Sequence, residues 1–525
     1  MTNTNLEKIV QERKIRCEEL FRDFSDAASI NEENLKIILE DNKNTEFGKH
    51  NGFSEIKSSN DYSLSIPLSE YSDYENFAEN IEHYTVYPIH EILTTSGSTG
   101  AQKLFPISKV AFERYSTYVH DMPYYLAAAE GKSIHMSIFR SGENKINILS
   151  SAYFRWLHNS GLVDFDMFAG GSELSITDEI RDVPYVKAWL MFSCPELEAI
   201  QSIYLYDIAM LMAWIEDNWR DLLYDMRNRT VTADVGEKEK KALLRNIPSE
   251  EWLDELETLL VEGFDEPILP RVWKNMKFVC GVGGKMYALQ EAQIKKYLGD
   301  VPVYQFSYAL SECIIAPAVE FGPAYYAILP RSAYYEFITE DGNDVVPMQN
   351  LKLGDTYELV LTTFSGLYRY KTGDLIHIVR FEGEAPVFEM VGKRQQVISV
   401  AGEKIDVYQA TSIINNWSEH YKLETINFAL SINTEKAPNG YTLFIEDPEF
   451  DELEDGAVYL DKLFRESSPD YDDVRNLKLL SAPVIKRVPY HSIEESQRKL
   501  NKLAHSKPQI FLNEERTKYL NKRVI

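Results

Sequence analysis

Cysteine is scarce in this sequence, and its scarcity excludes two kinds of protein. The 525 residues contain only 4 cysteines, and none of them are spaced as the ligands of a zinc site. Scattered cysteines in a chain of this length are typical of a reducing compartment, not of a small secreted domain held by disulfides. The sequence therefore predicts neither structural zinc nor a disulfide framework.

Long apolar runs and an excess of positive charge are also missing. The most apolar stretch, residues 203–215, is too short to span a bilayer, and residues 1–14 lack the apolar core of a secretory signal. Acidic residues outnumber basic residues by 82 to 55, which gives a formal net charge of −27 and repels nucleic acid and anionic membranes. We expect a cytoplasmic protein, a monomer or weak homo-oligomer, that binds neither nucleic acid nor membrane.

Helical and strand-like segments alternate along the chain, and this mixture predicts an α/β fold. Residues 1–40 read as two helices, the second starting at a capping box formed by Ser29 and Glu32. A helix is expected over 108–130, and residues 196–260 are rich in helix. Strands are predicted over residues 87–95, 133–139, 277–282, 301–306, 334–339, 356–362, 375–380 and 387–391.

A polar, turn-like run at residues 392–396 marks a candidate domain boundary. We therefore expect a large N-terminal domain over residues 1–394 and a smaller α+β C-terminal domain over residues 395–525. In the second domain, strands are expected over 425–432 and 441–445, and helices around Ala410 and Leu460.

The sharpest local signal is a loop rich in Gly, Ser and Thr between a predicted strand and a predicted helix. Its glycines let several backbone N–H groups point inward, its hydroxyls add donors, and its lysine adds a positive charge, which together suit a polyphosphate. A surface loop with incidental hydroxyls would have the same composition, and the loop is not a Walker A motif. The candidate ligands are Ser96, Gly97, Ser98, Thr99, Gly100 and Lys103.

The stretch from Thr95 to Lys103 resembles the phosphate loop of the adenylate-forming superfamily, which includes acyl-CoA ligases, luciferases and the adenylation domains of nonribosomal peptide synthetases. The resemblance implies a firefly-luciferase-like fold and ATP as a substrate. Tyr308-Ala309-Leu310-Ser311-Glu312 resembles the superfamily's second motif. It implies that Tyr308, Ala309 and Ser311 lie by the adenine and α-phosphate and that Glu312 holds Mg²⁺, for which a carboxylate is a suitable hard ligand.

Two further segments are candidates for the nucleotide site. Glycines at Gly283 and Gly284, after a predicted strand, allow close backbone approach to an adenine, although an ordinary turn has the same composition. The segment from Tyr370 to Asp374 resembles the third nucleotide motif, which implies that Asp374 binds both ribose hydroxyls. We also assign Tyr370 and Arg394 to the nucleotide. The order and spacing of the three motifs fit a single nucleotide site.

The longer string Gly366-Leu367-Tyr368-Arg369-Tyr370-x-x-Gly373-Asp374 closely resembles the plant auxin-responsive acyl acid amido synthetases, which join jasmonate, indole-3-acetate or benzoates to amino acids. Tyr335-Glu336-Phe337 and Tyr357-Glu358-Leu359-Val360 agree with that family. The resemblance implies that a small-molecule carboxylic acid is adenylated and then transferred to an amine or amino acid, with release of AMP and pyrophosphate. The phosphate loop is one residue shorter than in the plant family, which leaves the plant substrates open.

Near the C-terminus, the segment around Lys507 resembles a family segment whose lysine reaches the adenylate. The resemblance makes Lys507 a catalytic candidate together with Lys103 and Glu312, and Lys404 is its rival. The small domain is expected to rotate about residues 393–395. The acyl pocket is expected to draw on the aromatic segment 112–126, although an amphipathic helix packed on the core has the same pattern, and either Arg114 or Arg140 could meet the substrate carboxylate.

Two other functions use the same motifs. The adenylate could pass to a thiol, either coenzyme A or a carrier protein, or the chain could be a catalytically silent scaffold of this fold. The presence of all the expected polar residues speaks against the scaffold. AMP release that depends on amino acids, without coenzyme A, would separate the amide from the thioester.

Overall fold

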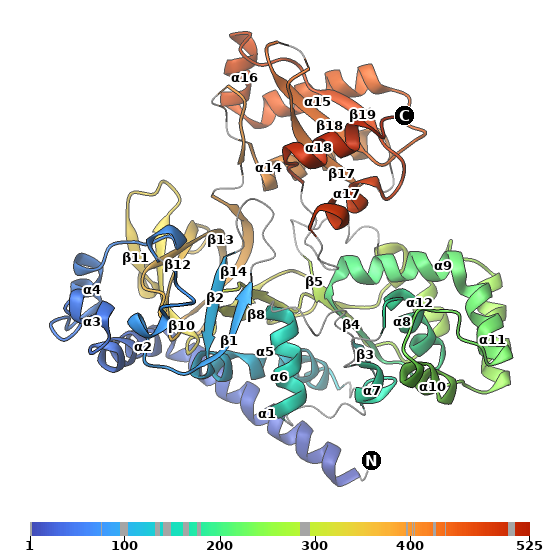
Figure 1. Ribbon diagram of the computed structural model, residues 1–525, viewed down its shortest axis with the longest axis horizontal. Coiled ribbons are helices and arrows are strands. Elements are labelled where there is room, and N and C mark those ends of the chain that lie inside the picture. Colours follow the sequence, from blue (N-terminus) through green and yellow to red (C-terminus); the bar gives the residue numbers. More distant parts are fainter. Residues whose placement is uncertain are drawn as a thin grey trace.

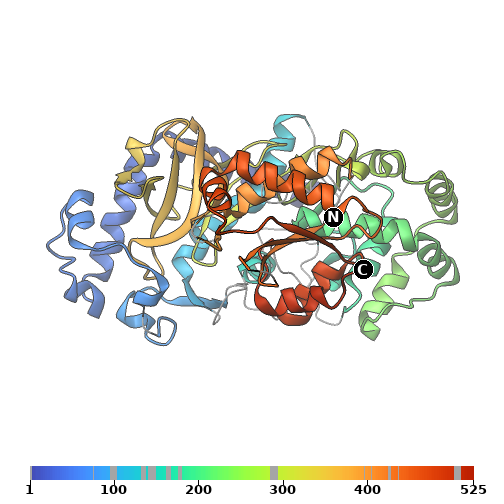
Figure 2. The same cartoon turned by 90° about the horizontal axis from the view of Figure 1, so that it is seen from above.

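The computed structural model describes most of the chain. The described residues are 3–525 apart from 75, 95–102, 132–136, 140–148, 161–166, 176–179, 284–293, 395–396, 402, 404, 424–426, 436 and 502–509. Figure 1 shows the N-terminal helices and the largest sheet on one side, a helical region on the other, and the C-terminal residues above both. Figure 2 shows the C-terminal residues lying over the middle of the molecule.

Four helices begin the chain: α1 (Asn3–Ser25), α2 (Ala27–Asn42), α3 (Glu46–His50) and α4 (Ser59–Ser65). The two helices expected over residues 1–40 are confirmed, but the capping box is wrong, because Ser29 lies inside α2. Burial of Ala27 and Ile30 extends the helix by most of a turn toward the N-terminus. Short 3-10 helices span Tyr71–Asp73, Ile81–His83 and Met348–Asn350.

The predicted phosphate loop connects the strands of an antiparallel hairpin, β1 (Ile89–Thr94) and β2 (Leu104–Ser108). Helix α5 (Lys109–Ala129) follows at once, and the Ser108 hydroxyl caps it by accepting a hydrogen bond from the Ala111 N–H. The strand and the helix expected on either side of the loop are therefore confirmed.

A second sheet consists of four parallel strands. Its order is β3 (Ser137–Phe139), β4 (Ala199–Tyr204), β5 (Phe278–Val282) and β6 (Val303–Tyr304). Strand β4 was expected to be part of a helical region, because a short apolar run cannot be assigned to helix or strand from periodicity alone. The helices that accompany this sheet are α6 (Leu149–Ser160), α7 (Gly171–Ser175), α8 (Val183–Phe192), α9 (Leu205–Asn228), α10 (Glu237–Arg245), α11 (Glu250–Val261) and α12 (Ile268–Val272).

The largest sheet is antiparallel and has the strand order β11-β10-β12-β13-β14-β9. Its strands are β9 (Tyr326–Ala327), β10 (Ala333–Thr339), β11 (Val345–Pro347), β12 (Thr356–Thr363), β13 (Tyr370–Glu382) and β14 (Ala385–Lys393). A separate short hairpin, β7 (Ser307–Ala309) and β8 (Ile314–Pro317), packs nearby. One apolar core joins α1, α2, α5 and this sheet, and another fills the helical region.

The C-terminal residues have an apolar core of their own, built around Trp417, Leu443 and Phe464. The elements are β15 (Val397–Ile398), β16 (Ile405–Asp406), α14 (Val407–His420), β17 (Phe428–Asn433), β18 (Gly440–Ile445), α15 (Leu453–Ser467), α16 (Pro469–Asn476), β19 (Val484–Arg487), α17 (Ser492–Asn501) and α18 (Glu514–Asn521). The strands and helices expected here are present. Within the described residues, no helix is both long enough and apolar enough to cross a bilayer.

Candidate nucleotide site

The open end of the β13–β14 hairpin holds a buried ion pair. Asp374 on β13 lies opposite Lys393 on β14, and the Lys393 ammonium contacts the Asp374 carboxylate. The Tyr308 hydroxyl donates a hydrogen bond to the other oxygen of this carboxylate. The Asp374 side chain is fully buried, with 0% of its surface exposed. Two residues predicted from separate motifs, Tyr308 and Asp374, are therefore in direct contact.

Glu312 joins the same cluster from the turn between β7 and β8. Reciprocal backbone hydrogen bonds between Leu310 and Cys313, with N–O distances of 2.8 and 3.2 Å, make this turn tight. Burial and the neighbouring Glu312 carboxylate raise the pKa of Tyr370. We call Tyr308, Glu312, Tyr370, Asp374 and Lys393 the Glu312 cluster.

The electrostatics of the Glu312 cluster balance two carboxylates against a lysine. Burial raises the pKa of Glu312, the Lys393 charge opposes this rise, and the Asp374 charge adds to it. Burial lowers the pKa of Lys393, but the charges of Asp374 and Glu312 outweigh burial and raise it. Lys393 is therefore held in its charged form between two acids.

The remaining residues of the second motif lie beside the cluster. Ala309 is in β7, opposite Ile314, and Ser311 is in the turn next to Glu312. The Tyr308 ring packs edge-on against Phe388 with a centroid distance of 5.4 Å, and burial and the Asp374 charge raise its pKa well above the ordinary value. Tyr308 is thus both a packed core residue and a hydrogen-bond donor to the cluster.

Lys103 is the only predicted phosphate-loop ligand within the described residues. Its side chain is exposed, its Nζ lies 5.3 Å from the centre of the Tyr71 ring, and its charge acts on Glu312. The Leu104 N–H donates to the Tyr71 hydroxyl at 2.8 Å, which holds the start of β2 at this place. Ser96, Gly97, Ser98, Thr99 and Gly100 lie outside the described residues.

The glycine-rich segment after β5 is described only in part. Gly283 directly follows the strand, whereas Gly284 lies outside the described residues. A Cβ on the neighbouring Gly281 would lie 2.7 Å from the Leu205 nitrogen and 2.9 Å from the Tyr204 carbonyl carbon. Close packing of β5 on the start of α9 therefore accounts for Gly281 without a ligand.

Arg394 lies apart from the Glu312 cluster, although the sequence assigned it to the nucleotide. Its guanidinium is 2.6 Å from the Glu358 carboxylate and donates to the Thr339 and Glu340 carbonyls at 3.1 and 3.0 Å. Lys393, expected only as part of a pivot, occupies the cluster instead. Lys393, the last residue of β14, lies opposite Asp374, whereas Arg394 lies in the turn that follows the strand.

Both candidate C-terminal lysines, Lys404 and Lys507, lie outside the described residues. Glu403, next to Lys404, is described and almost fully buried. Its carboxylate accepts hydrogen bonds from the Val400 and Ala401 N–H groups at 3.0 and 2.8 Å and from the Tyr441 hydroxyl. The chain just before Lys404 is therefore anchored to the C-terminal core.

The aromatic segment 112–126, predicted to contribute to the acyl pocket, lies in α5 and is only partly buried. His120 is buried, and the Tyr124 hydroxyl lies 2.6 Å from the Gln201 amide nitrogen that donates to it. Burial and the charges of nearby arginines lower the pKa of His120 well below its ordinary value, so this side chain is neutral. Arg114 stacks on Phe364 at 4.1 Å, and Arg140 lies outside the described residues.

Comparisons with known proteins identify the family to which the chain is similar. Residues 16–303 match the GH3 family N-terminal domain and residues 326–393 match the GH3 family central domain. The chain is 26% identical over 479 residues to indole-3-acetic acid-amido synthetase GH3.17 of Arabidopsis thaliana, covering 80% of this chain and 78% of that protein.

Solved structures share the fold. The GH3.15 acyl acid amido synthetase superposes with a TM-score of 0.84 at 21% identity, covering 97% of this chain and 96% of that chain. A 2-hydroxyisobutyryl-CoA ligase in its postadenylation state has a TM-score of 0.50 at 13% identity, covering 99% and 92%. The predicted adenylate-forming α/β fold is therefore confirmed.

Proposed function

Because the chain belongs to the GH3 family, we propose that it activates a carboxylic acid with ATP and then transfers the acyl group to an amine or amino acid. The enzyme is a ligase that forms carbon–nitrogen bonds and releases pyrophosphate and AMP. The observation that carries the proposal is the Glu312 cluster, in which two motifs about sixty residues apart meet through the hydrogen bond from Tyr308 to Asp374, with Glu312 close enough to Tyr370 to raise its pKa.

Asp374 is the proposed ribose ligand. An ionised carboxylate is a strong acceptor for paired hydroxyl groups. Tyr308 donates to one oxygen of this carboxylate and Lys393 forms an ion pair with the other, and the remaining lone pairs can accept the ribose hydroxyls. Lys393 replaces Arg394 as the cation of the nucleotide site in our proposal. Ala309, Ser311, Tyr370, Gly283 and Gly284 line the adenine and α-phosphate.

Glu312 is the proposed ligand for Mg²⁺, and its surroundings suit that role. It is a half-buried carboxylate whose pKa stays raised by burial although Lys393, a backbone hydrogen bond and Lys103 oppose the rise, so a divalent cation would relieve a real electrostatic cost. Among the described residues, no three His, Cys, Asp or Glu side chains are grouped as a metal site, which fits a metal held largely by phosphate oxygens and water. Bound Mg²⁺ would offset negative charge when the acid approaches the α-phosphate.

The lysines supply the remaining charge. Residues 96–100 hold the triphosphate through backbone N–H groups and hydroxyls, and Lys103 stabilises the departing pyrophosphate. Lys507 approaches the reacting phosphate from the C-terminal domain, with Lys404 as its rival. Residues 1–394 form the binding domain and residues 395–525 the mobile domain. The proposed pivot is at residues 393–395, where Arg394 is bound to β10 and β12.

The chemistry then proceeds in two steps. The substrate carboxylate attacks the α-phosphate of ATP, an oxygen–phosphorus bond forms, and pyrophosphate leaves. The amine attacks the carbonyl of the mixed anhydride, loses a proton, and releases AMP. No covalent bond to the protein is needed. We propose a cytoplasmic enzyme, monomeric or weakly self-associating.

The test is acid-dependent exchange of labelled pyrophosphate into ATP, screened over aromatic and aliphatic acids and crossed with amino acids. We expect exchange with at least one acid, and amide formation with an amine in the absence of coenzyme A. Acyl transfer only to coenzyme A would replace the amide by a thioester. ATP binding without exchange against any acid would contradict an enzymatic function.

A further inference from the structure

Arg369, the residue immediately before β13, is held by a buried glutamate. Its guanidinium forms a two-pronged ion pair with Glu336 on β10, with N–O distances of 2.9 and 3.0 Å. About 5% of the Arg369 side chain and 4% of the Glu336 side chain are exposed. The other nitrogen of the guanidinium donates to the Ser63 and Ile66 carbonyls at 2.7 and 2.6 Å. Each of the three guanidinium nitrogens therefore has a partner within the protein, and the side chain is almost fully buried.

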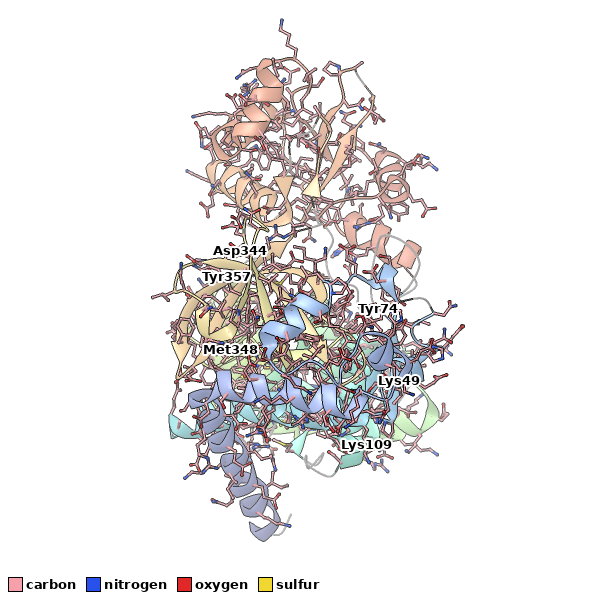
Figure 3. The ribbon with its side chains drawn as sticks, turned by 90° about the vertical axis from the view of Figure 1, so that its left-hand side faces the viewer. Lys49, Tyr74, Lys109, Asp344, Met348 and Tyr357 are labelled. Atoms are coloured by element: carbon pink, nitrogen blue, oxygen red, sulfur yellow. The ribbon has the colours of Figure 1, made fainter. Side chains whose placement is uncertain are left out.

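The backbone at Arg369 needs such support. Its φ of +47° is a left-handed conformation that side chains rarely adopt and that costs of the order of 1 kcal/mol. Ser69 pairs with both sides of Tyr370, since its N–H donates to the Arg369 carbonyl and its carbonyl accepts from the Lys371 N–H. Tyr74, labelled in Figure 3, accepts a hydrogen bond from the Tyr368 N–H at 2.8 Å. Hydrogen bonds therefore hold the backbone on both sides of Tyr370, the residue whose pKa the nearby Glu312 raises.

A second arginine holds the other chain of the same hairpin end. Arg394 directly follows β14 and pairs with Glu358 on β12. Glu336 lies opposite Val360 and Glu358 lies opposite Ile338, so both glutamates project from the same face of the β10–β12 pair. We call Arg369–Glu336 and Arg394–Glu358 the arginine anchors. They hold the start of β13 and the end of β14, and Tyr370, Asp374 and Lys393 lie between these two points in the sequence.

We propose that Glu336 and Glu358 are positioning residues of the nucleotide site, acting through Arg369 and Arg394 to fix the end of the β13–β14 hairpin against Glu312. Neither glutamate touches the nucleotide. Arginine suits this role because its planar fork fixes orientation as well as distance. The inference rests on the proposed function for the identity of the ligand, ATP.

A purely structural role would lower stability without changing ATP affinity, and the test is built on that distinction. The variants are Glu336→Gln, Glu358→Gln and the double variant Glu336→Gln/Arg369→Gln. The control is Asp225→Asn in α9, because Asp225 is also buried and hydrogen-bonded, to Tyr185 and Thr232, but belongs to the helical region. Each protein is assayed for thermal unfolding, ATP affinity by calorimetry, and the KM for ATP and for acid in pyrophosphate exchange.

For Glu336→Gln we expect the KM for ATP and the calorimetric Kd to rise roughly 10- to 100-fold, as for other residues that orient ligand-binding groups, with the KM for acid unchanged. Glu358→Gln should act in the same direction but less, because about 35% of the Arg394 side chain is exposed. Asp225→Asn should lose thermal stability and keep wild-type ATP affinity.

The double variant gives the sharpest result. Removing both members of a buried pair leaves no unpaired charge, so its melting temperature should recover relative to Glu336→Gln. Its ATP affinity should stay low, because Tyr370 has still lost its anchor. Recovery of ATP affinity together with stability, or wild-type ATP affinity in Glu336→Gln below its melting temperature, would overturn the proposal. A wild type that binds ATP without exchange would instead contradict the proposed function and leave the affinity test intact.

Discussion

Lys393 and Arg394 are consecutive in the chain, yet they belong to two regions that use ion pairs differently. In the Glu312 cluster, a lysine is shared between the carboxylates of Asp374 and Glu312. In the arginine anchors, each guanidinium pairs with a single glutamate of the sheet and with backbone carbonyls.

The difference follows from the two cations. An ammonium group is a compact point charge on a flexible stem, so it can neutralise two carboxylates and still move away from one of them. A guanidinium holds its partner in a fixed plane. In our proposal, the lysine therefore stands where the nucleotide binds, and the arginines stand where the backbone is held in place. The following predictions test whether these two regions are distinct.

The largest effect is expected from removing the charge at Glu312. Glu312→Gln keeps the shape of the side chain but removes a proposed Mg²⁺ ligand, so pyrophosphate exchange should fall roughly 100- to 1000-fold. Because burial raises the pKa of Glu312 against the opposing Lys393 charge, the ionised carboxylate destabilises the free protein. Thermal unfolding should therefore show an unchanged or higher melting temperature. Wild-type exchange in this variant would remove Glu312 from the site.

Removing the lysine should chiefly cost stability. Lys393→Met leaves the fully buried Asp374 without its cation, and loss of one partner of a buried pair costs about 3 kcal/mol. Urea unfolding measures this loss. The double variant Lys393→Met/Asp374→Asn should recover much of it, because no unpaired charge remains. Losses that simply add would show that the two side chains do not depend on each other.

High pH should weaken the lysine ion pair but not the arginine ion pairs. The charges of Asp374 and Glu312 outweigh burial and raise the pKa of Lys393 above the 10.5 of a free lysine. A raised lysine pKa means that the stability from this pair is complete at neutral pH and is lost as pH rises through the folded-state pKa. The difference in unfolding free energy between wild type and Lys393→Met should therefore shrink above pH 10.5.

The arginine anchors provide the control for that titration, because guanidinium groups in general stay charged at such pH values. The difference in unfolding free energy between wild type and Glu336→Gln should stay constant as the pH rises. If both differences shrink together, the loss reflects general alkaline unfolding and not the titration of Lys393.

The smallest effect is expected at Arg394. Arg394→Lys keeps the positive charge but loses the planar guanidinium group. Because about a third of the Arg394 side chain is exposed, the cost in unfolding free energy should stay below about 1 kcal/mol. Arg369→Lys, at a buried two-pronged pair, should cost more in the same urea experiment. Equal losses would mean that burial does not distinguish the two anchors.

Local patterns allowed much of the fold to be predicted. Alternating β-branched and aromatic residues located β10, β12 and β14, and the apolar periodicity located α1, α2 and α5. Strand β4 was missed because its short apolar run lies directly before the apolar start of α9. The capping box at Ser29 was misplaced because burial of the preceding turn, and not the side-chain cap, decided where α2 begins.

The sequence predicted which residues form the candidate site better than it predicted which of them are in contact. Tyr308, Glu312, Tyr370 and Asp374 were selected from two motifs, and the structure brings them together. The choice of Arg394 over Lys393 could not be made from the sequence, because it depends on which residue of β14 lies opposite Asp374. The roles of Glu336 and Arg369 were also hidden, since 33 residues separate the two partners.

By itself, the sequence determined the family, the adenylate-forming fold and the residues that can carry charge to a nucleotide, because these depend on residue types and their order along the chain. Only the tertiary structure decided which cation neutralises Asp374 and which glutamates hold the hairpin end. The physical reason is that strand register and burial set these pairs, and both arise from contacts between segments that are distant in sequence.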